Sequence, residues 1–359
     1  MNSITINEDI IFTVRSGKFL VWNLRSGEQY EIFEKRYLDR LYELTTALPL
    51  AYVSSEEDHE PSEAGLLETR NEPSAPKETQ WGWDDIAKIF HLGSKHNFPA
   101  DLSSESESAE QGYLDFCESI ANDIPCINIE KDGKIISLPS PSPSSLATPL
   151  ISTLMNRKTS RHFEPAPVSL EVVANLLFTT FGKIHGDTHI RELEKRGVKS
   201  VGYRRSSPSA GCLQATEAYL IALNVNDLPM GIYHYRSHQH SLTLVNEEIS
   251  DLNKTLCHQS FASDAAFLIV MTSRFDKLWW KYPHSRAYRS ALLDVGHLSQ
   301  TFNLAATALG MNTWITGYFI DDLLNEIVGA DGIKEHSIFV AAAGPGHSDP
   351  LSPEMQKLI

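Results

Sequence analysis

The stretch "RRSSPSAGCLQATEAYLI", residues 204–221, joins an irregular loop to an apolar run. Pro208 and Gly211 interrupt regular secondary structure, so several backbone N–H groups of the loop are left free to donate. A loop of this kind can lie along a planar ring and bond its heteroatoms, and Gln214 adds a side-chain donor and acceptor. From these residues alone, an ordinary loop before a strand is an equally good interpretation.

Helices and strands alternate around this loop from residue 150 onward. A helix is predicted at 169–182, because Ser169 is a typical N-cap and Gly182 follows the apolar face. A longer amphipathic helix is predicted at 289–309. Strands are predicted at 215–225, 231–245 (a hairpin), 265–273 and 337–346. The pattern indicates an α+β domain, and no G-x-G-x-x-G follows a strand, so a Rossmann domain is not supported.

Composition excludes several classes of protein. The 359 residues are 42% apolar, which is enough for one large core or two domains. The chain has no long apolar run and no leader with a basic and an apolar region, so we expect a cytoplasmic protein without a membrane partner. Its four cysteines fit no zinc spacing, so no metal site is predicted.

The acidic charge is concentrated in one segment. Residues 54–125 carry 17 acidic and 4 basic residues, which is −13 of the net −15. The rest of the chain is close to neutral and shows no basic stripe, so we expect no nucleic-acid partner. Three regions are predicted from this shift: a small β-rich module at 1–53, an acidic and partly disordered linker at 54–149 with a short helix near 81–98, and a main domain at 150–359.

Two further segments carry side chains suited to a ligand. In "NRKTSRHF", residues 156–163, basic and hydroxyl side chains alternate: Arg157, Lys158, Thr159, Ser160 and Arg161. Guanidinium forks beside hydroxyl donors form a good phosphate grip, although a solvated basic turn is the alternative. In "GMNTWITGYF", residues 310–319, the Thr316–Gly317 step permits close backbone approach to a ligand. The alternative there is a plain turn between a helix and a strand.

The order of these motifs resembles the nitroreductase-like flavoprotein superfamily. R-x-[ST]-x-R-x-F is followed by SPSAG-x-L-Q-x-x-E-A-Y, then by "YRSALLDVGHLSQTFNLAATALG" and a G-x-F turn. The chain is more narrowly similar, over residues 150–346, to the SagB-type branch, the FMN-dependent azoline dehydrogenases of thiazole/oxazole-modified peptides. "AKIFHLGSKHNF" at 87–98 resembles the aromatic–histidine segment before that domain, and the N-terminal module is similar in position to small peptide-recognition domains.

This resemblance implies an α+β FMN-binding fold, with an antiparallel-rich sheet flanked by helices, in a homodimer that binds FMN between subunits. The positions that match the family's cofactor contacts are Arg157, Lys158, Thr159, Arg161, Pro208, Ser209, Ala210, Gly211, Gln214, Ile315, Thr316 and Gly317. The loop 208–214 is often supplied by the partner subunit. The chain departs from the pattern at Tyr318, where many relatives have glycine, and after Gly346, where no basic residue follows.

The pair Lys281–Tyr282 resembles the catalytic pair of azoline dehydrogenases. Oxidation of a thiazoline removes a hydride and a carbon-bound proton, and FMN takes only the hydride, so a base is needed. Burial by Trp279 and Trp280 is expected to lower the pKa of Lys281 from about 10.4 toward about 7–8, where an amine works as a base. A snorkelling lysine and a core tyrosine are the alternative, and His297 is expected to be a core histidine.

Three functions are therefore compatible with the sequence. The first is an FMN-dependent azoline dehydrogenase that acts on a peptide or carrier-bound intermediate, with O2 as the oxidant of the reduced flavin and a cyclodehydratase-type enzyme as a candidate partner. The second is an NAD(P)H-dependent nitro or quinone reductase on the same fold. The third is a non-catalytic flavoprotein scaffold in a biosynthetic complex. The Lys–Tyr pair favours the first, because a reductase needs no base for a C–H bond.

Overall fold

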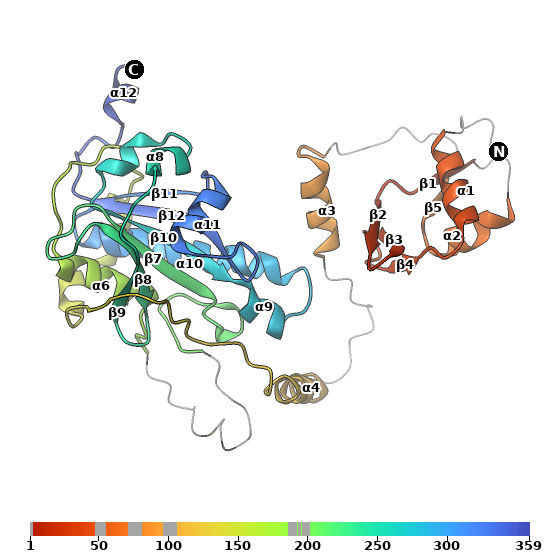
Figure 1. Cartoon of the computed structure of the whole chain (residues 1–359), viewed down its shortest axis with the longest axis horizontal. Helices are drawn as coiled ribbons and strands as arrows, with labels where there is room; N and C mark the ends of the chain where they lie inside the picture. Colours follow the sequence, from red (N-terminus) through yellow and green to blue (C-terminus); the bar gives the residue numbers. More distant parts are fainter. Residues whose placement is uncertain are drawn as a thin grey trace. The chain divides into compact units, whose positions relative to one another are not determined.

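The computed structural model describes residues 3–46, 55–70, 81–95, 106–185, 192, 195 and 202–359. The chain divides into two compact units, residues 1–104 and 105–359, here called unit 1 and unit 2 (Figure 1). This division falls within 54–149, the segment that the sequence predicts as a single linker. No helix in the described ranges is long and apolar enough to cross a bilayer.

Unit 1 contains the antiparallel meander that the sequence predicts. Strand β3 (Lys18–Asn23) lies between β2 (Ile10–Arg15) and β4 (Gln29–Glu31), and helix α1 (Lys35–Thr46) follows. The other elements of unit 1 are β1 (Ser3–Ile6), α2 (His59–Glu63), β5 (Leu67–Arg70) and α3 (Asp85–Gly93). Helix α3 is the short helix predicted near 81–98, of which residues 96–98 lie outside the described part.

The prediction of a mobile linker is wrong for residues 55–70. Strand β5 pairs antiparallel with β1, and Leu66 just before it is buried. The buried carboxylate of Asp58 accepts hydrogen bonds of 2.7 and 2.9 Å from the guanidinium of Arg40. Its acidic composition is typical of a linker. The segment is nevertheless folded, because Arg40 pairs with Asp58 and because Leu66 and Leu67 are buried.

Unit 2 is built on a seven-stranded sheet in the order β11-β12-β10-β7-β8-β9-β6. Every neighbouring pair is antiparallel. The strands are β6 (Ile135–Ser137), β7 (Thr216–Ala222), β8 (Gly231–Arg236), β9 (Ser241–Asn246), β10 (Phe267–Arg274), β11 (Asn312–Thr316) and β12 (Glu335–Gly344). The predicted α+β fold with an antiparallel-rich sheet is thereby confirmed.

Helices cover both faces of this sheet because its strands alternate between two cores. Leu220 and Ile269 point to a core shared with α6 (Leu170–Phe181) and α10 (Ala287–Ala308). Tyr219 and Val270 point to a second core shared with α8 (Leu252–Thr255) and α11 (Asp321–Val328). This is the period of two that a sheet buried on both faces requires.

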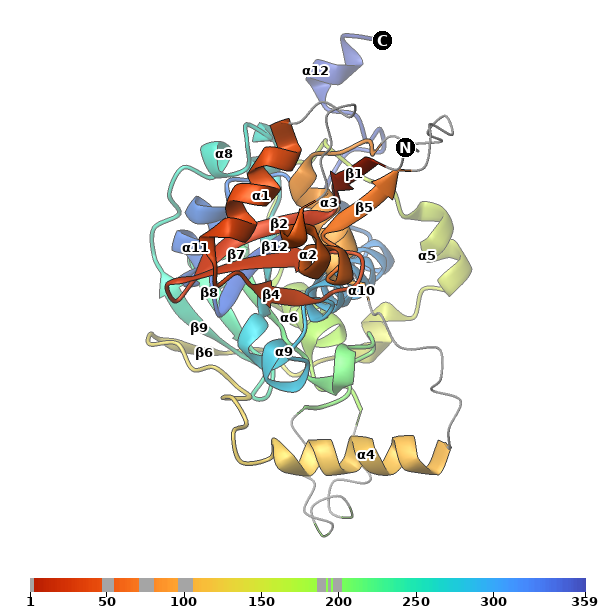
Figure 2. The ribbon, with the colours of Figure 1, turned by 90° about the vertical axis from the view of Figure 1, so that its right-hand side faces the viewer.

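The two long helices begin and end near the predicted residues. The Ser169 side chain accepts a hydrogen bond from the backbone N–H of Val172, and α6 ends at Gly182. Helix α10 ends before Gly310, whose φ of 78° is the left-handed conformation common after a helix. The short C-terminal helix α12 (Pro353–Gln356) projects away from the sheet in both views (Figures 1 and 2).

Three further helices flank the main elements in the described part of unit 2. Helix α5 (Leu150–Asn156) precedes the basic motif, and α9 (Phe275–Lys281) connects β10 to α10. Helix α4 (Ser106–Ser119) lies where the sequence predicts a mobile segment at 101–111. That prediction is wrong for residues 106–111, because the acidic, serine-rich run continues into a helix with Tyr113 on one face.

Candidate functional site

The loop before β7 has a strained backbone. Gly211, Cys212 and Gln214 have φ values of 56°, 58° and 48°, and two of these three residues carry a side chain. The left-handed conformation costs an L-residue about 1 kcal/mol. Strain of this kind persists only where neighbouring groups hold the backbone in place, and it is concentrated at functional sites.

Helix α10 holds one side of the loop through Asp294. The carboxylate accepts a 2.7 Å hydrogen bond from the Ser209 hydroxyl and a 3.1 Å bond from the backbone N–H of Ala210. The Ser209 hydroxyl in turn accepts a 3.0 Å bond from the N–H of Gln214. Burial raises the pKa of Asp294, although these donors oppose the rise. Asp294 carries no local sequence signal of this role, because nothing along the chain connects it to residue 209.

Helix α9 brings the predicted catalytic pair to the same loop. The ammonium of Lys281 lies 3.5 Å from the carbonyl oxygen of Gly211, and its side chain is buried. A Cβ at position 211 would lie 2.5 Å from the hydroxyl of Tyr282 and 3.0 Å from Nζ of Lys281. A larger residue at position 211 would therefore have to displace Lys281 or Tyr282. The structure places two separately predicted groups in contact.

The expected cause of a lowered Lys281 pKa is not found. Trp279 is 46% exposed, and the indole N–H of Trp280 donates to the backbone carbonyl of Ile120 instead. Burial lowers the pKa of Lys281, but a hydrogen bond with the hydroxyl of Tyr113 and the charge of nearby phenols outweigh it. The net pKa of Lys281 is above its ordinary value, so the expected shift toward 7–8 is wrong for this conformation.

Helix α4 thus contributes a residue that the sequence analysis missed. Nζ of Lys281 lies 5.5 Å from the ring centroid of Tyr113 and 5.9 Å from that of Tyr282. An ammonium at this distance is attracted by both aromatic rings. Tyr113 is far away in the sequence and lies in a serine-rich acidic run, so no local pattern could have identified it.

The basic motif lies along the edge of the sheet. Thr159 pairs in parallel with Thr313 of β11, and the N–H of Ser160 donates to the carbonyl oxygen of Thr313 over 2.8 Å. Nζ of Lys158 donates to the carbonyl oxygen of Ser348. Within the described ranges, the guanidinium groups of Arg157 and Arg161 have no hydrogen-bond or ion-pair partner. Two free cations beside a hydroxyl remain available to an anion.

The predicted turn after β11 is close to this motif. Ile315 and Thr316 are in β11 itself, the strand against which Thr159 lies. Gly317 and Tyr318 are exposed, and a Cβ at Gly317 would make an ordinary contact, so the chain's own packing does not require glycine there. In the part of the chain that the structure describes, no hydrogen bond or ion pair joins these residues to the loop 208–214.

A groove of about 600 Å³ opens beside the loop. Its lining residues are His185, Arg204, Arg205, Ser207, Pro208, Ser209, Cys212 and Gln214. Gln214 is 5% exposed, and its side-chain amide has no hydrogen-bond partner among the described residues. An amide that lines a groove without a protein partner can bond a ligand or water there. The groove therefore has the polar groups of a ligand site.

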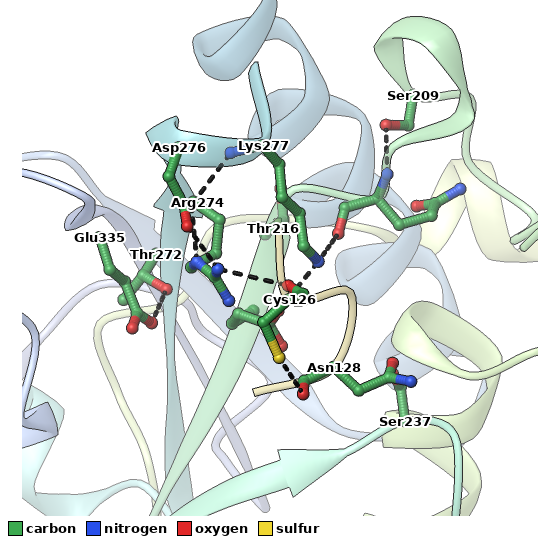
Figure 3. Close-up of polar contacts among 12 residues, drawn as sticks. Cys126, Asn128, Ser209, Thr216, Ser237, Thr272, Arg274, Asp276, Lys277 and Glu335 are labelled. Atoms are coloured by element: carbon green, nitrogen blue, oxygen red, sulfur yellow. Dashed lines mark hydrogen bonds and ion pairs between the residues drawn. The ribbon is translucent and has the colours of Figure 1, made fainter. Parts of the chain in front are cut away.

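A buried ionic cluster lies beneath the loop, and its lysine, Lys277, is drawn in Figure 3. Nζ of Lys277 is 3.4 Å from Oε1 of Glu217 and 3.4 Å from the carbonyl oxygen of Gln214. Oε2 of Glu217 is 3.3 Å from Nε2 of His234. Burial raises the pKa of Glu217, but Lys277 and His234 outweigh it and hold this pKa far below its usual range. Burial lowers the pKa of Lys277, with Glu217 opposing.

His297 differs from its prediction. The sequence places it on the apolar side of the long helix, beside Val295 and Leu298, whereas the structure exposes its side chain. Val295 and Leu298 are buried as predicted. Residues two and one positions away lie on other faces of a helix, so closeness along the chain did not settle the orientation of His297.

Comparison with known proteins gives a family and a fold. The nitroreductase family matches residues 154–345. A protein named as a nitroreductase, from Methanocaldococcus jannaschii, is 27% identical over 197 residues, 54% of this chain and 90% of the relative. The trifolitoxin operon protein TfxC of Rhizobium leguminosarum bv. trifolii is 25% identical over 270 residues, 73% of this chain and 72% of the relative. A crystal structure from Anabaena variabilis, also named as a nitroreductase, has a TM-score of 0.53 at 21% identity and shows the same fold, although the match spans 77% of this chain and 50% of that one.

Proposed function

Because the chain belongs to the nitroreductase family, we propose that it is an FMN-dependent oxidoreductase that oxidises azolines to azoles on a peptide or carrier-bound intermediate. The observation that carries this proposal is the contact of Lys281 and Tyr282 with the strained loop at Gly211. The same loop lines the groove through Cys212 and Gln214, which supports a role for Lys281 and Tyr282 near a bound ligand. The similarity to a trifolitoxin operon protein supports a peptide product.

Two groups of residues, the basic motif at 157–161 and the loop 208–214, are here called the part-sites, and their polar groups fit FMN. Arg157 and Arg161 are cations without partners in the described chain, which suits a phosphate. The side-chain amide of Gln214, which lines the groove, and the irregular loop suit the edge of a flavin ring. When bound, FMN would accept the hydride that leaves the substrate carbon and pass its two electrons to O2, which yields hydrogen peroxide. Since no bond joins the part-sites within the described chain, we propose that a second copy completes the site in a homodimer.

The residues of this chain would handle the proton. Removal of a carbon-bound proton requires the neutral amine of Lys281, and Tyr282 would orient the substrate or relay the proton. In the structure, the hydroxyl of Tyr113 raises the pKa of Lys281 and so favours the ammonium. Displacement of Tyr113 by the substrate would leave burial as the main influence and lower this pKa. We propose that substrate binding thereby produces the base.

A nitro or quinone reductase on the same fold is the second candidate function. The raised pKa of Lys281 favours it, because a reductase that takes hydride from NAD(P)H needs no amine base. Steady oxidation of NADH by the purified protein with a quinone acceptor, and no reaction with a thiazoline peptide, would establish the reductase.

Unit 1 offers a surface for the peptide part of the substrate. A groove of about 410 Å³ has an apolar floor that includes Val21 and Leu41, and a rim with acidic side chains: Glu31, Glu34, Glu60 and Glu63. Strand β4 is an edge strand, so its unpaired backbone groups can accept another strand. We propose that this groove binds a peptide segment with basic and apolar residues.

The first experiment is the visible absorbance of the purified protein, with identification of the released chromophore. We expect FMN, and colourless protein that cannot be reconstituted with FMN would refute the proposed function. Arg157→Ala should lower the FMN content, while the control Lys254→Ala, at an exposed lysine of α8, should not. Lys281→Ala should keep FMN and lose thiazoline oxidation. A Lys281→Ala protein that oxidises a thiazoline peptide at the wild-type rate would contradict the assigned base.

A further inference from the structure

The buried pair Lys277–Glu217 has no part in the predicted chemistry. Lys277 is 4% exposed and Glu217 is 7% exposed. Burial of two charges costs several kcal/mol per ion, and their attraction recovers this only with good geometry and further hydrogen bonds. A pair of apolar residues would fill the same space at less cost. The position of the pair, directly under the strained loop, therefore needs an explanation.

Helix α9 contacts the loop with two lysines one helical turn apart. Lys281 approaches the carbonyl oxygen of Gly211 at 3.5 Å, and Lys277 approaches that of Gln214 at 3.4 Å. Residues four apart lie on the same face of a helix, so both ammonium groups reach the loop from one side. Each carbonyl belongs to a residue with positive φ. The two lysines thus hold both ends of the strained segment 211–214.

Glu217 fixes Lys277 in this position. Its carboxylate lies between Nζ of Lys277 and the imidazole of His234, and all three side chains are buried. Arg205 anchors the next part of the backbone, because its guanidinium donates to the carbonyl oxygen of Thr216 over 3.1 Å. The cation that bonds Gln214 therefore cannot turn away toward water.

We propose that Lys277, held by Glu217, is a positioning residue that keeps Gln214 in its left-handed conformation and its side-chain amide in the groove. The same contact sets the distance between Gly211 and Lys281, because residues 211–214 form one short turn. The inference rests on the proposed function only in treating Gln214 as a ligand contact. The conformation of the loop itself is independent of that assignment.

The test is amide hydrogen exchange in the variant Lys277→Met/Glu217→Gln. Removal of both charges leaves neither member of the pair as an unpaired buried ion, so unit 2 should stay folded. The amides to follow are those of Cys212, Leu213 and Gln214, each hydrogen-bonded within the loop. Loss of a hydrogen bond from a charged donor should speed their exchange about tenfold. The amides of β11, the edge strand three places from β7 in the sheet, should be unchanged, which separates loop release from general unfolding.

The matched control is Lys131→Met/Glu335→Gln. This variant also removes an ion pair between a lysine and a buried carboxylate, whose Nζ and Oε2 are 3.4 Å apart. Among the described residues, this pair makes no hydrogen bond or ion pair with the loop. This control should leave the exchange of the loop amides at the wild-type rate. Equal loop exchange in wild type and Lys277→Met/Glu217→Gln would overturn the proposal. An equally large rise of loop exchange in the control variant would also overturn it.

A milder variant and a binding measurement complete the test. If the double variant does not fold, Glu217→Asp draws the carboxylate back by one methylene, and loop exchange should still rise about twofold to threefold; an unchanged rate overturns the proposal. FMN affinity should fall about tenfold in Lys277→Met/Glu217→Gln. If wild-type protein binds no FMN, the proposed function fails while the exchange measurement still decides the role of Lys277.

Discussion

Replacement of Gly211 by alanine tests the contact between the loop and the candidate catalytic pair. The added Cβ would lie 2.5 Å from the hydroxyl of Tyr282, 3.0 Å from Nζ of Lys281 and 3.1 Å from its Cδ. Atoms do not approach this closely, so at least one of the two side chains must move. The φ of 56° adds the cost of a left-handed L-residue. Gly211→Ala should therefore both destabilise unit 2 and displace the groups proposed to handle the proton.

The size of the effect follows from these two terms. The left-handed conformation costs about 1 kcal/mol, and overpacking against displaced side chains costs about 1–3 kcal/mol, so the free energy of unfolding should fall by about 2–4 kcal/mol. At about 2–4 °C per kcal/mol for a unit of this size, the melting temperature should fall by about 4–16 °C. Thermal unfolding followed by circular dichroism measures the shift, and peroxide release with a thiazoline peptide measures turnover.

Gly310→Ala is the matched control within unit 2. Gly310 also has a positive φ, 78°, but a Cβ there would meet no atom within 4 Å. It should lose only the conformational term, about 1 kcal/mol, and keep turnover. Equal losses of stability in the two variants, with turnover retained in Gly211→Ala, would show that the loop does not approach Lys281 and Tyr282 as described. That result would remove the observation on which the proposed function depends.

Three other changes test the buried charges and helix α4. Glu217→Gln should cost about 3–5 kcal/mol at pH 7, because it leaves Lys277 buried without its carboxylate. Since the folded-state pKa of Glu217 lies below the ordinary 4.5, this advantage of wild type is complete above about pH 4.5 and should shrink in urea titrations at lower pH. Tyr113→Phe should shift the acetylation profile of Lys281 to lower pH, since that hydroxyl raises the pKa; a shift to higher pH would contradict the contact. Trp280→Phe, which removes an indole N–H bond near the end of α4, should speed amide exchange in that helix, and unchanged exchange would show that the bond does not hold it.

Local patterns predicted the elements of unit 2 well. The cap at Ser169 needs only the residues of its own turn, and the ends of α6 and α10 near Gly182 and Gly310 follow from glycine alone. The strands β7 and β10 contain continuous apolar runs, 218–222 and 267–271, which is typical of a sheet covered on both faces. In these cases, the information that fixes the structure lies within a few residues.

Long-range contacts could not be predicted in this way. Lys277 was not singled out, because its partner Glu217 lies 60 residues away. Asp294 lies 85 residues from Ser209, whose hydroxyl donates a hydrogen bond to its carboxylate. Among the many acidic residues of 54–125, no local pattern distinguishes Asp58, which pairs with Arg40. Each of these side chains is defined by a partner that only the folded chain brings close.

Structural features that destabilise the folded state lie close together in this molecule, and their position indicates where the function lies. Left-handed residues and a buried ion pair occur together within the loop 208–217 and its supports. Each would be selected against in a loop that only connected a helix to a strand, because each raises the free energy of the folded state. A glycine-and-alanine turn would make the same connection more cheaply. Their concentration around Gln214 and Gly211 is therefore best explained by a ligand that requires this backbone shape, with the stability of the surrounding sheet offsetting the strain.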